Sequence, residues 1–145
     1  MQQIVVGIDG SQGARRALEW AVAEAKLRDA HLVVVHAWLE PAAVAVGSVI
    51  TAGGVEPEVF EEAAWRTVTE LLAAVDTTGL PQGIETHVVA GAQARAELDA
   101  AHGADLVVVG SRGHGGFTGL LLGSVSQQVA HHATGPLVVV RAGHA

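Results

Sequence analysis

The chain has 145 residues, half of them apolar, and a formal net charge of −7. This length predicts a single domain over residues 1–145 with a buried core, and the lack of cysteine excludes a disulfide framework, a Cys-based metal site and a thiol nucleophile. The eight basic residues are spread along the chain and form no stripe, which argues against a nucleic-acid partner.

The N-terminal segment MQQIVVGIDGS enters an apolar run without a basic region, so it does not predict a signal peptide. The apolar runs of the chain stop at about eight residues, which is too short to cross a bilayer. We therefore expect a cytoplasmic protein without a membrane partner.

The first half of the chain alternates strand and helix patterns. Residues 3–8 predict a strand that ends in Asp9-Gly10-Ser11, and Ser11 is placed to cap a helix with apolar residues at i, i+3, i+4 spacing. Residues 31–38, HLVVVHAW, predict a second strand. Residues 39–55 have no convincing period and predict a long connection, of the kind that forms lids, binding loops or disordered segments.

The second half continues the alternation. We expect a helix over 56–75, a strand over 84–90, a helix over 92–101, a strand over 106–109, a helix starting with Ser124 as its cap, and a strand over 136–140. Strands that alternate with helices predict an α/β fold with a doubly wound parallel sheet and helices on both faces.

Five strands in the order 3-2-1-4-5 place the ligand site at the carboxyl ends of strands one and four, where the strand order reverses. This arrangement brings Asp9 and Gly10, at the end of the first strand, beside Gly110, at the end of the fourth. Two segments distant in sequence are therefore expected to meet at one cleft.

A glycine-rich loop follows the fourth strand, with glycines at Gly110, Gly113 and Gly123, and Ser124 directly after. Small residues leave the backbone N–H groups accessible to a ligand, and a helix N-terminus adds partial positive charge. The loop therefore predicts a phosphate site. The alternative is an ordinary flexible loop in which Ser124 only caps its helix and Asp9 only forms a turn. Arg112, in the same loop, either reaches a phosphate or is solvated.

The motifs of nucleotide-processing enzymes are missing from the sequence. GxxxxGK(S/T), GxSxG and HExxH do not occur, and the single lysine, Lys26, lies on the first predicted helix. Asp9 with a divalent ion supports slow hydrolysis at most, because no dedicated base is visible. A flavin-binding protein of this topology is a further alternative, but its phosphate loop usually follows strand one, where GIDGSQG fits poorly.

The spacing Gly110-x2-Gly113-x9-Gly123-Ser124 resembles the G-2x-G-9x-G-(S/T) signature of the ATP-binding branch of the universal stress protein family. The segments VVGIDGS, VVVHAW, ADLVVVGSRGHGG and HHATGPLVVVR are similar to that family as well. The resemblance covers essentially the whole chain and is weakest over residues 39–60.

The resemblance implies a site for ATP with Mg or Mn. Asp9 would reach the ribose hydroxyls or a metal at the phosphates, and Gly10 and Ser11 would line the same turn. The backbone of Ala37 would contact the adenine edge. The remaining positions that the resemblance implies are Val109 and Gly110 beside adenine and ribose, and Gly113, Gly123, Ser124 and Val125 at the phosphates.

These features favour an ATP-binding regulatory protein of the stress response, acting as a nucleotide-dependent switch or interaction module. Two alternatives stay open: a slow ATP-hydrolysing or nucleotidyl-transferring enzyme, and a nucleotide-independent dimeric interaction module. The terminal strand, residues 136–141, would be an apolar sheet edge in a monomer. The resemblance implies that this strand pairs antiparallel with its copy in a homodimer. No particular protein partner is indicated.

Overall fold

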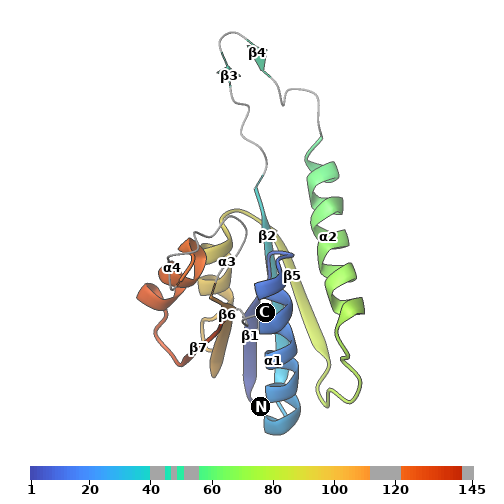
Figure 1. Ribbon diagram of the computed structural model, residues 1–145, viewed down its shortest axis with the longest axis vertical. Helices are drawn as coiled ribbons and strands as arrows, with labels where there is room; N and C mark the ends of the chain where they lie inside the picture. The colour runs from blue at the N-terminus through green and yellow to red at the C-terminus, as the bar shows by residue number, and fades with distance from the viewer. Residues whose placement is uncertain (40–44, 47–48, 51–55, 112–121, 142–145) are drawn as a thin grey trace.

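The computed structural model describes residues 1–39, 45–46, 49–50, 56–111 and 122–141 (Figure 1). Its helices and strands follow one another as the sequence predicts, apart from two short additional strands between residues 45 and 50, and about half of the predicted boundaries are shifted by one residue. In chain order they are β1 (Gln3–Gly7), α1 (Gln12–Arg28), β2 (His31–Trp38), β3 (Ala45–Val46), β4 (Val49–Ile50), α2 (Pro57–Ala74), β5 (Ile84–Ala90), α3 (Gln93–Ala100), β6 (Leu106–Gly110), α4 (Ser124–His132) and β7 (Leu137–Val140).

The main sheet has five strands in the order β5-β2-β1-β6-β7, and every pair within it is parallel. This order confirms the predicted 3-2-1-4-5 arrangement. β1 lies in the centre, with Val5 opposite Val33 of β2 and Val107 of β6. A separate antiparallel pair, β3 with β4, lies within the segment that was expected to be an irregular connection.

Helices cover both faces of the sheet, α1 and α2 on one side and α3 and α4 on the other (Figure 1). Alternate residues of the central strand pack on opposite faces: Ile4 and Val6 join the core under α1 and α2, and Val5 packs against α3. Burial on both faces explains why these strands consist of continuous β-branched and apolar runs.

The start of α1 agrees with the prediction, whereas the start of α4 does not. Ser11 is the N-cap of α1, and its Oγ accepts a hydrogen bond from Ala14 N at 3.1 Å. The N-cap of α4 is Gly123, so the prediction that Ser124 caps this helix is wrong. The helix begins one residue earlier because extended Gly123 already provides the first carbonyl acceptor, to Gln127 N at 2.9 Å.

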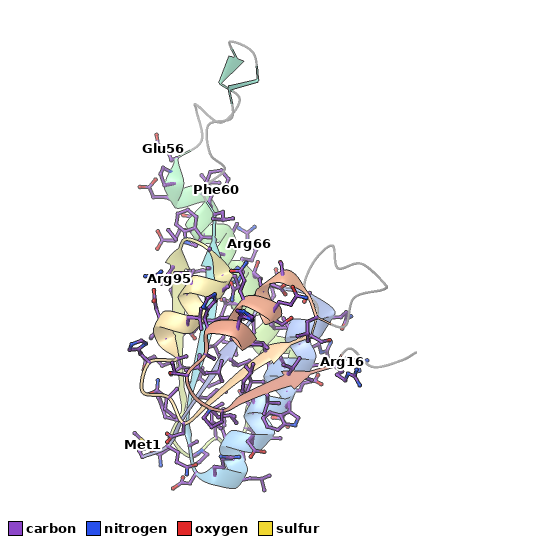
Figure 2. The ribbon with its side chains drawn as sticks, turned by 90° about the vertical axis from the view of Figure 1, so that its left-hand side faces the viewer. Met1, Arg16, Glu56, Phe60, Arg66 and Arg95 are labelled. Atoms are coloured by element: carbon purple, nitrogen blue, oxygen red, sulfur yellow. The ribbon has the colours of Figure 1, made fainter. Side chains whose placement is uncertain are left out.

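The helices present charged side chains to solvent at separate places. Arg16, Arg66 and Arg95 come from α1, α2 and α3, and all three are exposed (Figure 2). Within the described part of the chain, none of the helices combines the length and the apolar character needed to cross a bilayer.

Candidate functional site

The turn between β1 and α1 carries the first group of predicted site residues. Asp9 is half-buried, and its Oδ1 accepts a hydrogen bond from Ser11 N at 2.9 Å, which closes an Asx turn. Gly10 between them has a φ of +84°, a left-handed conformation that glycine adopts without strain. The local structure thus gives Asp9 the turn role that the sequence offered as its simpler interpretation, and it holds the carboxylate at the carboxyl end of the central strand.

The predicted residues of distant segments meet around one small cavity of about 30 Å³. Asp9 and Ser11 line it from the β1–α1 turn, Val109 and Gly110 from the end of β6, and Val125 from the first turn of α4. This is the place where the strand order reverses, as the topology predicted. The amides of the first helical turn have no acceptor within their own helix, so the α4 N-terminus at this cavity favours an anion.

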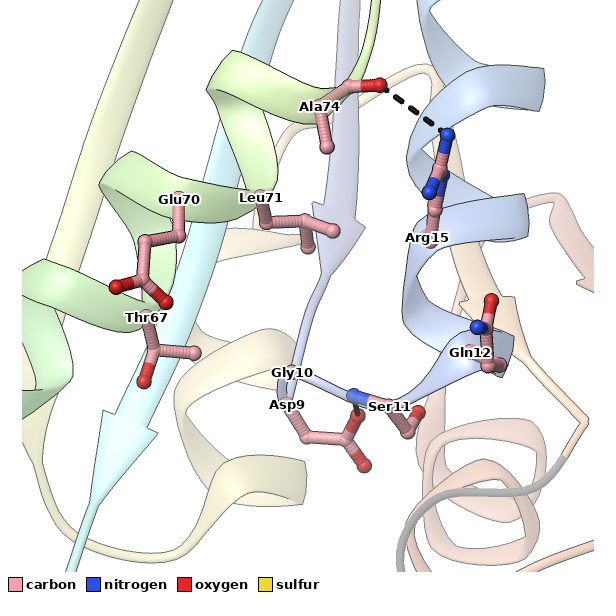
Figure 3. Close-up of a pocket in the computed structure, with 9 residues that line it drawn as sticks. All are labelled: Asp9, Gly10, Ser11, Gln12, Arg15, Thr67, Glu70, Leu71 and Ala74. Carbon is pink, nitrogen blue, oxygen red and sulfur yellow. Dashed lines mark hydrogen bonds between the residues drawn. The ribbon is translucent and has the colours of Figure 1, made fainter.

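A wider hollow of about 380 Å³ adjoins the same turn on the side of α1 and α2 (Figure 3). Asp9, Gly10 and Ser11 form one wall of it, and residues of α2 form the other. Arg15 Nη2 donates a hydrogen bond to Ala74 O at 3.3 Å, which ties the two helices together. Asp9 and Ser11 line both spaces, so a ligand at this turn would have room to extend from one into the other.

Gly110 has a packing reason to be glycine. A Cβ on this residue would lie 2.8 Å from the carbonyl oxygen of Gly13, in the first turn of α1. Because that neighbour is backbone, a side chain could fit only if helix and strand moved apart. The sequence interpretation assigned this glycine to ligand approach alone, and the structure adds close contact between α1 and β6.

Other predicted residues lie near the cavity or outside the described residues. Gly123 is buried, and its N–H donates to Ser111 O at 2.6 Å, so in this structure that amide is engaged within the chain. Ser124 is exposed at the first position of α4. Arg112 and Gly113 lie outside the described residues.

Glu97, on α3, is a site residue that the sequence reasoning missed. Its side chain is only 2% exposed and lines the small cavity together with Asp9. The carboxyl occupies the space above Gly7, where a Cβ would be 1.6 Å from Oε1. Among the described residues, Glu97 Oε2 finds no hydrogen-bond partner.

The surroundings of Glu97 favour its neutral form. Burial raises the pKa of this carboxyl from its ordinary 4.5 to about 7. The hydrogen bond from Gln93 opposes this effect, and the negative charge of Asp9 adds to it. The cavity therefore holds an exchangeable proton near neutral pH.

Gln93, one turn before Glu97, is the second missed residue. Its Nε2 donates to Glu97 Oε1 at 2.7 Å and to Val35 O at 3.1 Å, and its Oε1 accepts from Ala37 N at 2.7 Å. The resemblance assigns the backbone of Ala37 to adenine, and the N–H of this residue is thus occupied by a side chain of α3. A Gln and a Glu four residues apart were the available signal, but on a short helix this pattern is typical of a solvated face.

Comparisons with known proteins agree with this architecture. Residues 1–141 match the Universal stress protein family. A universal stress protein of Mycolicibacterium smegmatis is 39% identical over 138 residues, which are 95% of this chain. The chain spans 45% of the length of that relative.

Solved structures of universal stress proteins have a similar fold. The chain is similar to the universal stress protein UspA of Lactobacillus plantarum, with a TM-score of 0.78, 23% identity and 97% of both chains covered, a likeness that shows the fold alone. It is also similar to a universal stress protein solved in complex with cAMP, with a TM-score of 0.67, 28% identity and 98% of both chains covered.

Proposed function

Because the chain belongs to the universal stress protein family, we propose that it is a cytoplasmic regulatory protein of the stress response that binds ATP at the carboxyl ends of β1 and β6. Binding of the nucleotide would bias its conformation or its association. The bound cAMP of a structural neighbour supports a nucleotide as the class of ligand.

The convergence of Asp9, Val109–Gly110 and Val125 on one cavity is the observation that carries this proposal. A carboxylate beside the sheet edge suits ribose hydroxyls, and the α4 N-terminus suits phosphates. The same proposal includes the predicted nucleotide contacts of seven further residues: Gly10, Ser11, Ala37, Arg112, Gly113, Gly123 and Ser124. The small cavity is smaller than a typical ligand site of at least ~300 Å³, so nucleotide binding requires side chains such as Gln93 to move or the ligand to lie partly in the wider hollow.

A Mg²⁺ or Mn²⁺ ion fits this site as a companion of the nucleotide. Both ions prefer oxygen ligands, and Mg²⁺ is commonly held by one or two carboxylates together with phosphate oxygens. Asp9 would supply the carboxylate. Over residues 1–39, 45–46, 49–50, 56–111 and 122–141, His, Asp and Glu side chains form no group of three or more able to hold a metal. The phosphates would therefore supply most of the ligands, and the ion would neutralise their charge.

We propose binding rather than turnover as the main activity, with weak ATP hydrolysis at most. Phosphoryl-transfer enzymes such as P-loop NTPases and protein kinases place a conserved lysine on the nucleotide phosphates. The single lysine, Lys26, lies in the last turn of α1, at the end of the helix opposite Ser11. It is thus too remote to serve the cavity.

Titration calorimetry of nucleotide-free protein with Mg-ATP tests the proposal. We expect saturable binding that Asp9→Ala weakens about tenfold, since it removes a contact to the sugar or the ion. Asp99→Ala makes the same chemical change on the exposed face of α3 and should leave the affinity unchanged. Wild-type protein that shows no saturation at millimolar Mg-ATP would contradict the proposal.

We also propose a homodimer formed through residues 136–141. β7 is an edge strand of the five-stranded sheet, and Leu137–Val140 are half-buried apolar residues that leave one edge of the backbone without a strand partner in the described sheet. Exposed apolar edges of this kind tend to pair with another strand. Antiparallel pairing of two copies across a two-fold axis would cover both edges.

A further inference from the structure

The β1-facing edge of β2 extends beyond the strand that covers it. β1 pairs with β2 only as far as Gly7 opposite Val35, and Ile8 N adds one more bond to Val35 O at 2.9 Å. On its other side, β2 stays paired with β5 to its last residue, Trp38. Past this point the N–H of Ala37 points toward β1 and needs another partner, while Val35 O, already bonded to Ile8 N, keeps a second lone pair.

The side-chain amide of Gln93 hydrogen-bonds to this edge of β2. Its Oε1 accepts from Ala37 N at 2.7 Å, and its Nε2 donates to Val35 O at 3.1 Å. Residues i and i+2 of a strand direct their polar groups to the same side, so one carboxamide reaches both. The amide is held in this orientation by its second donor contact, to Glu97 Oε1 at 2.7 Å.

A carboxamide offers an acceptor next to a donor, and so does the edge of adenine, where a ring nitrogen lies next to the amino group. In hydrogen-bonding terms, Gln93 thus imitates a nucleobase on the backbone of β2. Gln93 lines the same cavity as Asp9, Val109 and Gly110. Its Oε1 accepts the hydrogen bond from Ala37 N that a bound base would otherwise accept.

We propose that Gln93 is the residue that sets the affinity of the site for the nucleobase, by competing with the base for the backbone groups of Val35 and Ala37. This inference rests on the proposed nucleotide function and adds a specific competitor to it. In the free protein Gln93 satisfies the strand edge. In the bound protein its side chain turns away and the base takes its place.

Two titrations test the competition, one with Mg-ATP and one with inorganic triphosphate, each on the wild type, Gln93→Ala and Gln93→Asn. The alanine variant has no amide, and the asparagine amide is one methylene too short to reach β2. Both should bind ATP about tenfold more tightly, the equivalent of about one hydrogen bond that the ligand no longer has to displace. The affinity for triphosphate should not change, because it has no base.

Gln127→Ala serves as a matched control, since Gln127 is an exposed glutamine on α4 and should alter neither titration. Thermal melting of each variant establishes that it is folded at the titration temperature.

An unchanged or weaker affinity of folded Gln93→Ala for ATP, with wild-type protein that binds ATP, would overturn the competition and leave the nucleotide site intact. An equal gain for ATP and triphosphate would overturn it as well, because the effect would then not lie at the base. Failure of the wild type and every variant to bind ATP would overturn the proposed function together with this inference.

Discussion

Replacing Glu97 by glutamine should make the protein more stable at alkaline pH. The carboxyl is buried beside Asp9, and its pKa rises from 4.5 to about 7 on folding. The folded state then binds the proton more tightly than the unfolded state, so the contribution of Glu97 to stability is full below about pH 4.5 and is lost as the pH rises through about 7. At 1.36 kcal/mol per pKa unit, the loss approaches about 3 kcal/mol.

Glutamine stays neutral at every pH and can still accept the hydrogen bond from Gln93 Nε2 through its amide oxygen. The variant should therefore not lose stability as the pH rises through about 7. In urea unfolding, we expect the free energies of unfolding of Glu97→Gln and the wild type to be similar at about pH 4, below the ordinary pKa of the carboxyl. At about pH 8.5 the variant should be more stable by up to ~3 kcal/mol.

Asp99→Asn provides the matched control, because Asp99 lies on the same helix and its side chain is 67% exposed. Its effect should be small and nearly independent of pH. A stability difference between Glu97→Gln and the wild type that is the same at both pH values would contradict a raised pKa for Glu97.

Two further predictions follow from packing and from the sheet edge. Gly110→Ala should destabilise the protein by about 1–3 kcal/mol in urea unfolding, because its Cβ would press on Gly13 O. Gly135→Ala, with its nearest atom 3.8 Å away, should change stability little, and equal losses for both variants would contradict the packing argument. Light scattering at micromolar concentration should give a dimer mass for the wild type and a smaller mass when Val139→Lys places a charge in β7, whereas a monomeric wild type would contradict the proposed dimer.

The strands and their order could be predicted from the sequence because their signals are local and redundant. The runs His31–Trp38 and Ile84–Ala90 have the predicted boundaries. Right-handed crossovers between parallel strands leave few arrangements, so the meeting of Asp9 with Gly110 followed from topology.

Gln93 and Glu97 could not be predicted in the same way. Their helix is short and rich in alanine, and its polar residues suggest exposure when the helix is considered alone. Glu97 is buried because Gly7, on a strand distant in sequence, has no side chain and leaves room for the carboxyl. Gln93 hydrogen-bonds to the backbone of β2 because β2 continues beyond the end of β1, which depends on the strand lengths in the folded sheet.

An NMR titration of backbone amides with Mg-ATP would show directly whether the nucleotide binds where β1, β6 and α4 meet. We expect saturable shifts at Gly10–Ser11, Gly110 and Val125, which surround this cavity. We also expect a shift at Ala37, whose N–H donates to Gln93 in the free protein. Shifts confined to other elements such as α2, or no saturable shift at millimolar nucleotide, would contradict nucleotide binding at this cavity.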